Sequence, residues 1–302
     1  MSAITVAAFY RFFPFTDHPD WIAPLTQLAA ENGVKGTILL ADEGINSTIA
    51  GPEEGINAVL DYLTADPRIE GLIVKRSAHD TMPFLRLKVR SKPEIVTFKQ
   101  PDVDAANATG THVKPADWNA IVDNPDIPVI DTRNEFEVEI GTFKGAINPH
   151  TEKFTEFAAW VDDHLDPQTT PEVAMFCTGG IRCEKASAWL RKKGFQEVFQ
   201  LDGGILQYLE DMPKEESTWE GECFVFDQRV TVDHDLEAGD YELCRACWQP
   251  VSPEQRESAE FEEGISCPRC FANRTDADRA RYAERMKQMN LAKNRGELHL
   301  GR

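Results

Sequence analysis

Residues 176–186 read Phe-Cys-Thr-Gly-Gly-Ile-Arg-Cys-Glu-Lys-Ala. An apolar run at residues 173–176 predicts a buried strand in front of this stretch, and residues 185–190 have the spacing of a helix behind it. A strand, a glycine-rich loop and a helix start would place Cys177 among backbone N–H groups at a helix N-terminus. Such a setting favours an anion and lowers the pKa of a thiol. With the positive charge of Arg182 nearby, we predict a reactive thiolate rather than a structural cysteine.

The loop resembles the active-site loop of the rhodanese family, in which the cysteine carries a persulfide sulfur. Residues 128–137 and 141–148 resemble the first strand of that fold and the turn leading out of it. Residues 198–205 resemble its last strand and closing Gly-Gly turn. Related phosphatases have one more residue between cysteine and arginine, which gives a cup large enough for phosphate. Only four residues separate Cys177 from Arg182 here, which predicts the smaller, sulfur-type cup; they are Thr178, Gly179, Gly180 and Ile181.

Composition limits the class of protein. A chain of 302 residues is long enough for two or three domains. Four of its seven cysteines form CxxC pairs, which indicates metal and thiol chemistry in a reducing compartment, and we expect a cytoplasmic protein. No run approaches the roughly 20 apolar residues of a membrane span, and the N-terminus does not read as a signal peptide. A net charge of −19 argues against broad, nonspecific nucleic-acid binding.

The N-terminal part, residues 1–100, has alternating strand and helix patterns. They predict a ferredoxin-like or acylphosphatase-like α+β domain of order βαββαβ with a trailing strand. The strands are expected at residues 4–10, 36–41, 46–51, 72–76 and 85–90, and the helices at 19–33, with Asp17 as a cap, and 52–64. A segment rich in Asp, Ala, Asn and Gly, within residues 101–114, is the expected linker. The rhodanese-like domain is then expected over residues 115–218.

A basic stretch stands out against this acidic background. Apolar and basic residues alternate along residues 85–90, and this period of two puts Arg86, Lys88 and Arg90 on one face of a strand, with Lys92 close behind. A sheet face of this kind can bind RNA. It can equally be a solvated face whose basic residues pair with neighbouring acids, and the sequence favours neither.

The C-terminal region, residues 219–302, contains two CxxC pairs separated by nineteen residues. Two such pairs offer four thiolates, which complete the tetrahedral shell of a structural zinc ion and leave no open position. The expected ligands are Cys244, Cys247, Cys267 and Cys270. Residues 278–293 then predict a polar helix rich in arginine and lysine, with Arg295 and Arg302 beyond it. This helix is a second RNA-binding candidate or a solvated tail.

The whole architecture resembles the rhodanese-related tRNA uridine 5-hydroxylases. The shared strings are residues 40–46 (Leu-Ala-Asp-Glu-Gly-Ile-Asn), the loop at 177–185 and the CxxC pairs; Ser47, where a glycine is expected, is a small departure. The resemblance implies oxygen-dependent 5-hydroxylation of the wobble uridine (position 34) of tRNA, with dioxygen as a co-substrate. It covers nearly the entire chain, and it leaves open which tRNAs are substrates, which redox cofactor takes part and whether the chain forms a homodimer.

Two other functions remain as alternatives. A persulfide sulfurtransferase, using thiosulfate or a protein donor, would need only the loop, and a non-catalytic rhodanese module would need neither Cys177 nor Arg182. On the hydroxylase interpretation, Cys177 reacts, while Arg182 and the loop N–H groups stabilise its anion. Cys183 is either a second thiol at the same cup or a small core residue on the first helical turn. We expect Asp131 and Arg133 to support the loop.

Overall fold

The computed structural model describes residues 4–296 and divides into two compact units. Unit 1 comprises Met1–Phe224 with Asp233–Leu236, and unit 2 comprises Val225–Val232 with Glu237–Arg302. The predicted basic position Arg302 lies outside the described residues.

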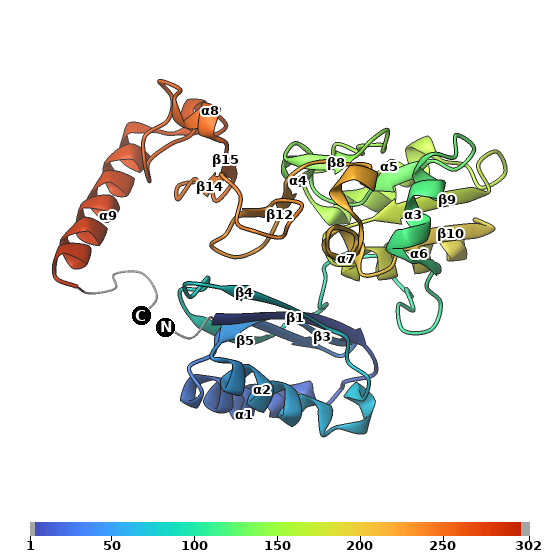
Figure 1. The fold of residues 1–302 in the computed structure, drawn as a ribbon, viewed down its shortest axis with the longest axis horizontal. Coiled ribbons are helices and arrows are strands. Elements are labelled where there is room, and N and C mark those ends of the chain that lie inside the picture. Colours follow the sequence, from blue (N-terminus) through green and yellow to red (C-terminus); the bar gives the residue numbers. More distant parts are fainter. Residues whose placement is uncertain (1–3, 297–302) are drawn as a thin grey trace. The chain divides into compact units, whose positions relative to one another are not determined.

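The N-terminal part of unit 1 is a mostly antiparallel sheet with two helices, which confirms the predicted α+β domain. The five-stranded sheet has the order β4-β1-β3-β2-β5, in which β5 pairs parallel with β2. Both helices cover one face of this sheet and bury the apolar residues of their inner sides against it (Figure 1). The elements are β1 (Ile4–Phe12), α1 (His18–Glu31), β2 (Lys35–Ala41), β3 (Gly44–Gly51), α2 (Glu53–Thr64), the 3₁₀ turn η1 (Pro67–Ile69), β4 (Val74–His79) and β5 (Leu87–Ser91).

The predicted cap of α1 differs from the structure in one respect. Asp17 occupies the N-cap position, but its side chain caps no backbone N–H group. Instead its carboxylate accepts hydrogen bonds from Arg68, at 2.6 and 2.9 Å, and from the Trp21 ring nitrogen at 3.2 Å. A guanidinium that offers two parallel N–H donors competes successfully with a single backbone amide for the same carboxylate.

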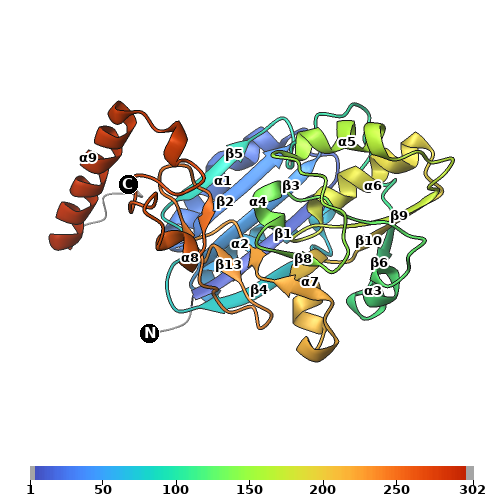
Figure 2. The same cartoon turned by 90° about the horizontal axis from the view of Figure 1, so that it is seen from above.

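The second part of unit 1 is built on a parallel sheet of order β6-β10-β9-β7. Figure 2 shows β9 and β10 beside each other within it. Thr111–Val113, at the end of the segment taken as a linker, form the edge strand β6 on β10. The elements are β6, α3 (Pro115–Val122), β7 (Val129–Asp131), α4 (Glu135–Val138), β8 (Gly141–Phe143), η2 (Phe154–Glu156), α5 (Phe157–His164), β9 (Glu172–Phe176), α6 (Ile181–Lys193), β10 (Glu197–Leu201), α7 (Gly204–Asp211), η3 (Lys214–Glu216), β11 (Trp219–Gly221) and β12 (Cys223–Phe224).

The remaining elements belong to the cysteine-rich region. Its largest element is α9, which confirms the polar helix predicted over residues 278–293 and extends it by a residue or two at each end. Thr275 caps this helix by accepting a hydrogen bond from the backbone N–H of Asp278 at 3.1 Å. The elements are β13 (Thr231–Val232), β14 (Glu242–Leu243), β15 (Pro250–Val251), α8 (Pro253–Arg256), η4 (Phe271–Asn273) and α9 (Asp276–Asn294).

Candidate active site

The loop between β9 and α6 holds Cys177 at the start of the helix, where the sequence predicts it. The side chain is almost completely buried, with 1% of its surface exposed. The backbone N–H of Gly180 donates to its Sγ atom at 3.1 Å. Gly180 is the N-cap of α6 and has a φ of +101°, which glycine adopts readily and other residues rarely do. The expected cradle of backbone donors at a helix N-terminus is therefore present.

The environment of Cys177 favours its thiolate. Burial by itself raises the pKa of the thiol, but several contacts outweigh it: a hydrogen bond with the Cys183 thiol, the charge of Arg182 and the backbone N–H groups of both residues. Together they lower the pKa of Cys177 from 9.0 to about 5. Burial and the adjacent Cys177 anion raise the pKa of Cys183 well above its usual value. The pair therefore consists of one thiolate and one thiol that donates to it.

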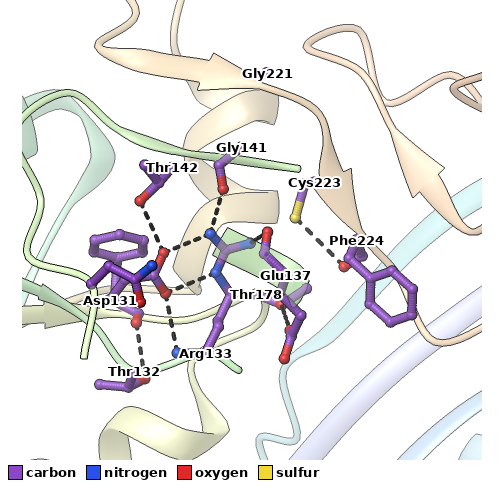
Figure 3. Close-up of polar contacts among 12 residues, drawn as sticks. Asp131, Thr132, Arg133, Glu137, Gly141, Thr142, Thr178, Gly221, Cys223 and Phe224 are labelled. Carbon is purple, nitrogen blue, oxygen red and sulfur yellow. Dashed lines mark hydrogen bonds and ion pairs between the residues drawn. The ribbon is translucent and has the colours of Figure 1, made fainter. Parts of the chain in front are cut away.

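Arg182 makes its hydrogen bonds with a carboxylate that sequence reasoning missed. Its two terminal nitrogens each donate to one oxygen of Glu137 at 2.7 Å, and one of them also donates to the Thr178 hydroxyl at 3.2 Å. Both charged side chains are buried, and Thr178 also contacts Glu137 (Figure 3). Arg182 therefore acts on the sulfur through its charge, while its hydrogen bonds go to Glu137 and Thr178 and the Gly180 N–H donates to the sulfur.

A second buried ion pair supports the same region. Arg133 donates to both carboxylate oxygens of Asp131, at 2.9 and 2.6 Å, and neither side chain is exposed (Figure 3). Its remaining donors reach the carbonyl oxygens of Glu137 and Gly141. Arg133 thus ties the end of β7 to α4 and β8. This geometry agrees with the supporting role expected for the pair.

The Gly-Gly turn after β10 packs directly on the cysteine loop. The backbone N–H of Ile205 donates to the carbonyl oxygen of Cys177 at 3.0 Å, and that of Leu206 donates to Thr178 at 3.1 Å. A Cβ atom on Gly204 would lie 2.5 Å from the Cys177 carbonyl oxygen, so only glycine fits there. The two Gly-rich segments predicted from the sequence, the cysteine loop and the turn after β10, therefore pack directly against each other.

The N-terminal sheet also contacts α6. Lys185 is buried and pairs with Glu43 at 2.8 Å and with Glu94 at 2.5 Å. Glu43 belongs to the string at residues 40–46, and its carboxylate also accepts from the backbone N–H of Ile95 at 2.7 Å. Tyr10 of β1 donates to the Glu184 carboxylate at 2.9 Å. The string at residues 40–46 therefore holds the N-terminal domain against the helix that follows the cysteine loop.

The four predicted metal ligands gather in unit 2. Their sulfur atoms all lie within 4.8 Å of one another, and three of the four residues are buried. The Cys244–Cys270, Cys247–Cys267 and Cys267–Cys270 sulfur pairs are 3.9, 3.7 and 3.8 Å apart. These separations exceed a disulfide bond of about 2 Å. Within residues 4–296, this is the one group of cysteine, histidine and acidic side chains with the geometry to hold a metal ion.

The basic residues of β5 lie as the period-two pattern predicts. Leu87 and Val89 pack on the core beneath the helices, so Lys88 points to the opposite face of the sheet, together with Arg90. Arg86, Arg90 and Lys92 are exposed, and Lys88 is half-buried. Burial and the neighbouring charges of Arg86 and Arg90 lower the pKa of Lys88. The structure therefore brings these cations together at a sheet edge.

Basic side chains of α9 are partly committed to contacts within unit 2. Arg285 donates to the carbonyl oxygens of Arg245 and Gly264, at 2.6 and 3.0 Å. Arg279 lies over the ring of Phe271, 4.3 Å from its centroid, and donates to its carbonyl oxygen. At least these two arginines attach the helix to the cysteine cluster region, so a purely solvated tail does not describe the segment.

Comparison with known proteins first defines the class. Residues 4–95 match the family profile described as the UPF0176 acylphosphatase-like domain, and residues 114–211 match the rhodanese-like domain. The fold and the loop therefore define a rhodanese-type protein with an N-terminal acylphosphatase-like domain. A solved rhodanese-like domain from Anabaena sp. is 16% identical, covers 37% of this chain and 80% of its own, and has a TM-score of 0.31, too low to support an argument.

Two curated relatives then identify the family. The tRNA uridine(34) hydroxylase of Acaryochloris marina is 50% identical over 301 residues, which cover 100% of this chain and 97% of the relative. The enzyme of the same name from Agrobacterium fabrum is 53% identical over 297 residues, covering 98% and 95%. The chain belongs to the tRNA uridine(34) hydroxylase family. Among the described residues, no helix is both long and apolar enough to cross a membrane.

The thiolate geometry predicts the pH dependence of alkylation. Rates of iodoacetamide labelling, followed for each cysteine by peptide mass spectrometry, should rise for Cys177 with a midpoint near pH 5, because its pKa is lowered to about 5. Cys183 is the internal control, since its pKa is raised and it should stay unlabelled up to pH 8. A Cys177 midpoint between pH 8 and 9, the range of an ordinary thiol, would contradict the assignment.

Proposed function

We propose that this protein hydroxylates C5 of the wobble uridine, position 34, in tRNA, with dioxygen as the co-substrate. The observation that carries the proposal is the full-length identity of 50–53% to two enzymes of that name. The buried thiolate at Cys177 supports it, because the reaction needs a nucleophile close to the base.

The chemistry assigned to Cys177 follows from the electronic structure of uracil. C5 becomes nucleophilic once an anion has added to C6. Attack of the Cys177 sulfur at C6 would place the negative charge on C5 and O4, and C5 could then form a bond to oxygen. Loss of the C5 proton would break the sulfur–C6 bond and return the thiolate. Using one atom of dioxygen and reducing the other to water consumes two electrons and two protons, which an external reductant must supply.

We assign the other groups at the loop the role of stabilising the sulfur anion. We propose that the backbone N–H groups of the loop stabilise the thiolate before it attacks C6 and again after it is released. The contact of the Gly180 N–H with the sulfur supports this role. Arg182 contributes charge and, through Glu137, fixes the start of α6. Cys183 is proposed as a thiol donor to the thiolate rather than as a second nucleophile, because its own pKa is raised.

For the cysteine cluster we propose a structural zinc ion. Four sulfur atoms at 2.3 Å from one ion at tetrahedral angles lie about 3.8 Å apart. The three sulfur–sulfur distances given above, 3.7–3.9 Å, agree with that value, and all four sulfur atoms lie within 4.8 Å of one another. Four cysteine ligands leave no position for water or substrate, so the ion would stabilise unit 2 and take no part in the reaction. We also propose a cytoplasmic location, where the tRNA substrate is found and thiols stay reduced.

For tRNA binding we propose the cations on β5 and directly beside it, namely Arg86, Lys88, Arg90 and Lys92. They line a sheet edge, and Arg86, Arg90 and Lys92 are exposed. Phosphate groups of the substrate would relieve the repulsion that the crowded cations experience in the free protein.

The proposed activity has a direct test in cells. In a strain lacking this gene, 5-hydroxyuridine and its derivatives should disappear from bulk tRNA and return with the wild-type gene but not with Cys177→Ala. Nucleoside mass spectrometry measures them. Cys223→Ala is the matched control, because Cys223 is another buried cysteine whose pKa burial raises to about 12. Unchanged 5-hydroxyuridine with a loss of thiolated nucleosides would instead identify a sulfurtransferase.

The zinc proposal predicts a fixed metal content. Purified protein should contain one zinc ion per chain by plasma mass spectrometry, and Cys247→Ser should lose it, because three ligands bind far less tightly than four. The variant should also become sensitive to proteases within unit 2. Cys223→Ser should retain the ion. A wild-type protein free of zinc, or a Cys247→Ser variant with full zinc content, would refute the site.

The binding proposal predicts a salt-dependent loss of affinity. The double variant Lys88→Glu/Arg90→Glu should bind tRNA at least ~10-fold more weakly, and the slope of log Kd against log salt should fall by about 2. Filter binding over a salt series measures both. The control Lys192→Glu/Lys193→Glu changes the net charge equally on α6, where the two lysines already pair with Asp102 and Asp162. Equal losses in the two variants would indicate a general charge effect and contradict a binding site on β5.

A further inference from the structure

We propose that Lys75, a residue of the N-terminal domain, is a positioning residue of the active site and serves as the charge partner of the Cys177 anion. The proposal rests on the function assigned above only in taking that anion as the reacting species. It makes the active site composite, with the thiolate on the rhodanese-like domain and a cation on the acylphosphatase-like domain.

The register of the N-terminal sheet sets the direction of Lys75. On β4, Val74 lies opposite Phe9 of β1, and Lys75 lies opposite Ala8. Val74 and Phe9 belong to the core beneath the helices. Because side chains alternate along a strand, Lys75 points to the helix-free face of the sheet, as does Tyr10, two residues after Ala8. Two polar side chains with long reach therefore share a face that α1 and α2 do not cover.

Both side chains end at the cysteine loop. The Tyr10 hydroxyl is so close to Gly180 that a Cβ atom there would lie 2.6 Å from it. The Lys75 ammonium donates a hydrogen bond to the carbonyl oxygen of Gly203. Gly203 precedes Gly204, which packs against the Cys177 carbonyl oxygen and the Gly180 N–H. The two contacts are independent of each other and lie on the two Gly-rich segments that enclose Cys177.

The charges around Lys75 explain why its interaction with the sulfur matters. Burial lowers the pKa of Lys75 from 10.5 to about 8, while the negative charges of Cys177, Asp202 and Glu210 favour its ammonium form. Cys177 is the largest of these favourable contributions. Within residues 4–296, the ammonium donates to a carbonyl oxygen rather than to a carboxylate. Its charge is therefore not cancelled by a hydrogen-bonded acid.

Arg182 and Lys75 differ in this respect. Arg182 lies nearer in sequence to Cys177, but both of its terminal nitrogens are bound to Glu137. The other groups facing the sulfur are the Cys183 thiol, which donates to it, and Tyr10, whose pKa burial and nearby anions raise, so that it stays neutral. Lys75 thus adds a second positive charge near Cys177, and within residues 4–296 its ammonium is hydrogen-bonded to a carbonyl oxygen and not to a carboxylate. Attraction between the two charges stabilises both charged forms by the same amount.

The test measures the thiolate and not the product. In Lys75→Met, the pH midpoint for alkylation of Cys177 should rise by about one pH unit, because the attraction between the ammonium and the sulfur anion is lost. Lys75→Arg should keep the midpoint of the wild type. Lys35→Met is the matched control, since Lys35 is a half-buried lysine on the same helix-free face, on β2. All variants are measured as full chains by peptide mass spectrometry.

Each outcome decides the proposal. A Cys177 midpoint in Lys75→Met equal to that of the wild type would overturn it, as would an equal rise in Lys35→Met. Labelling of Cys183 monitors the packing of the loop, because an opened loop would expose both thiols. If packing is disturbed in Lys75→Met, the variant Lys75→Gln takes its place. It keeps an N–H donor for Gly203 and should show the same rise in the Cys177 midpoint. Product analysis is kept separate. If wild-type protein formed no 5-hydroxyuridine, the proposed function would fail while the alkylation shift would still report on Lys75.

Discussion

A nearly buried sulfur anion is the constraint on which the rest of the structure depends. Water cannot solvate Cys177, so protein groups must supply the stabilisation that hydration would give. The loop does so with backbone N–H groups, and backbone approaches this close are possible only where side chains are absent. Gly180 clears space for the Tyr10 hydroxyl, and Gly204 clears space for the Cys177 carbonyl oxygen. These glycines are therefore required by the close contacts around the thiolate as well as by the turns in which they lie.

The charged residues around the loop build a rigid, nearly neutral frame. Asp131 with Arg133 and Glu137 with Arg182 form two buried ion pairs, and each arginine also donates to neighbouring oxygen atoms. Removing one partner of such a pair leaves a buried charge uncompensated, which typically costs about 3–5 kcal/mol. The pairs therefore fix geometry at the ends of β7 and α6. Stabilisation of the sulfur comes from the Cys183 thiol, from the charge of Arg182 and from the backbone N–H groups at the start of α6.

Local patterns in the sequence predicted most of the fold and the position of Cys177 at the start of α6. The strands and helices of the N-terminal domain, the loop of Cys177 and the cysteine cluster all follow from short-range spacing. Contacts between residues far apart in the chain were missed, within the rhodanese-like domain for Glu137 and across domains for Lys75, because nothing near either residue in the sequence marks them. Glu137 reads as an ordinary acid in a first helical turn, where it also caps its helix. Lys75 reads as one of several basic residues on a strand.

Strong overall acidity and binding of an anionic substrate are compatible because electrostatic range is short. At physiological ionic strength, charges separated by more than about 8 Å are largely screened, so the net charge of −19 acts weakly at any one site. What matters is the local arrangement, and at β5 partial burial, together with the charges of Arg86 and Arg90, lowers the pKa of Lys88. Like charges kept together against their repulsion store free energy that a bound phosphate releases. The acidic remainder of the surface then disfavours nonspecific contacts elsewhere, which agrees with the tRNA-binding position proposed for this edge.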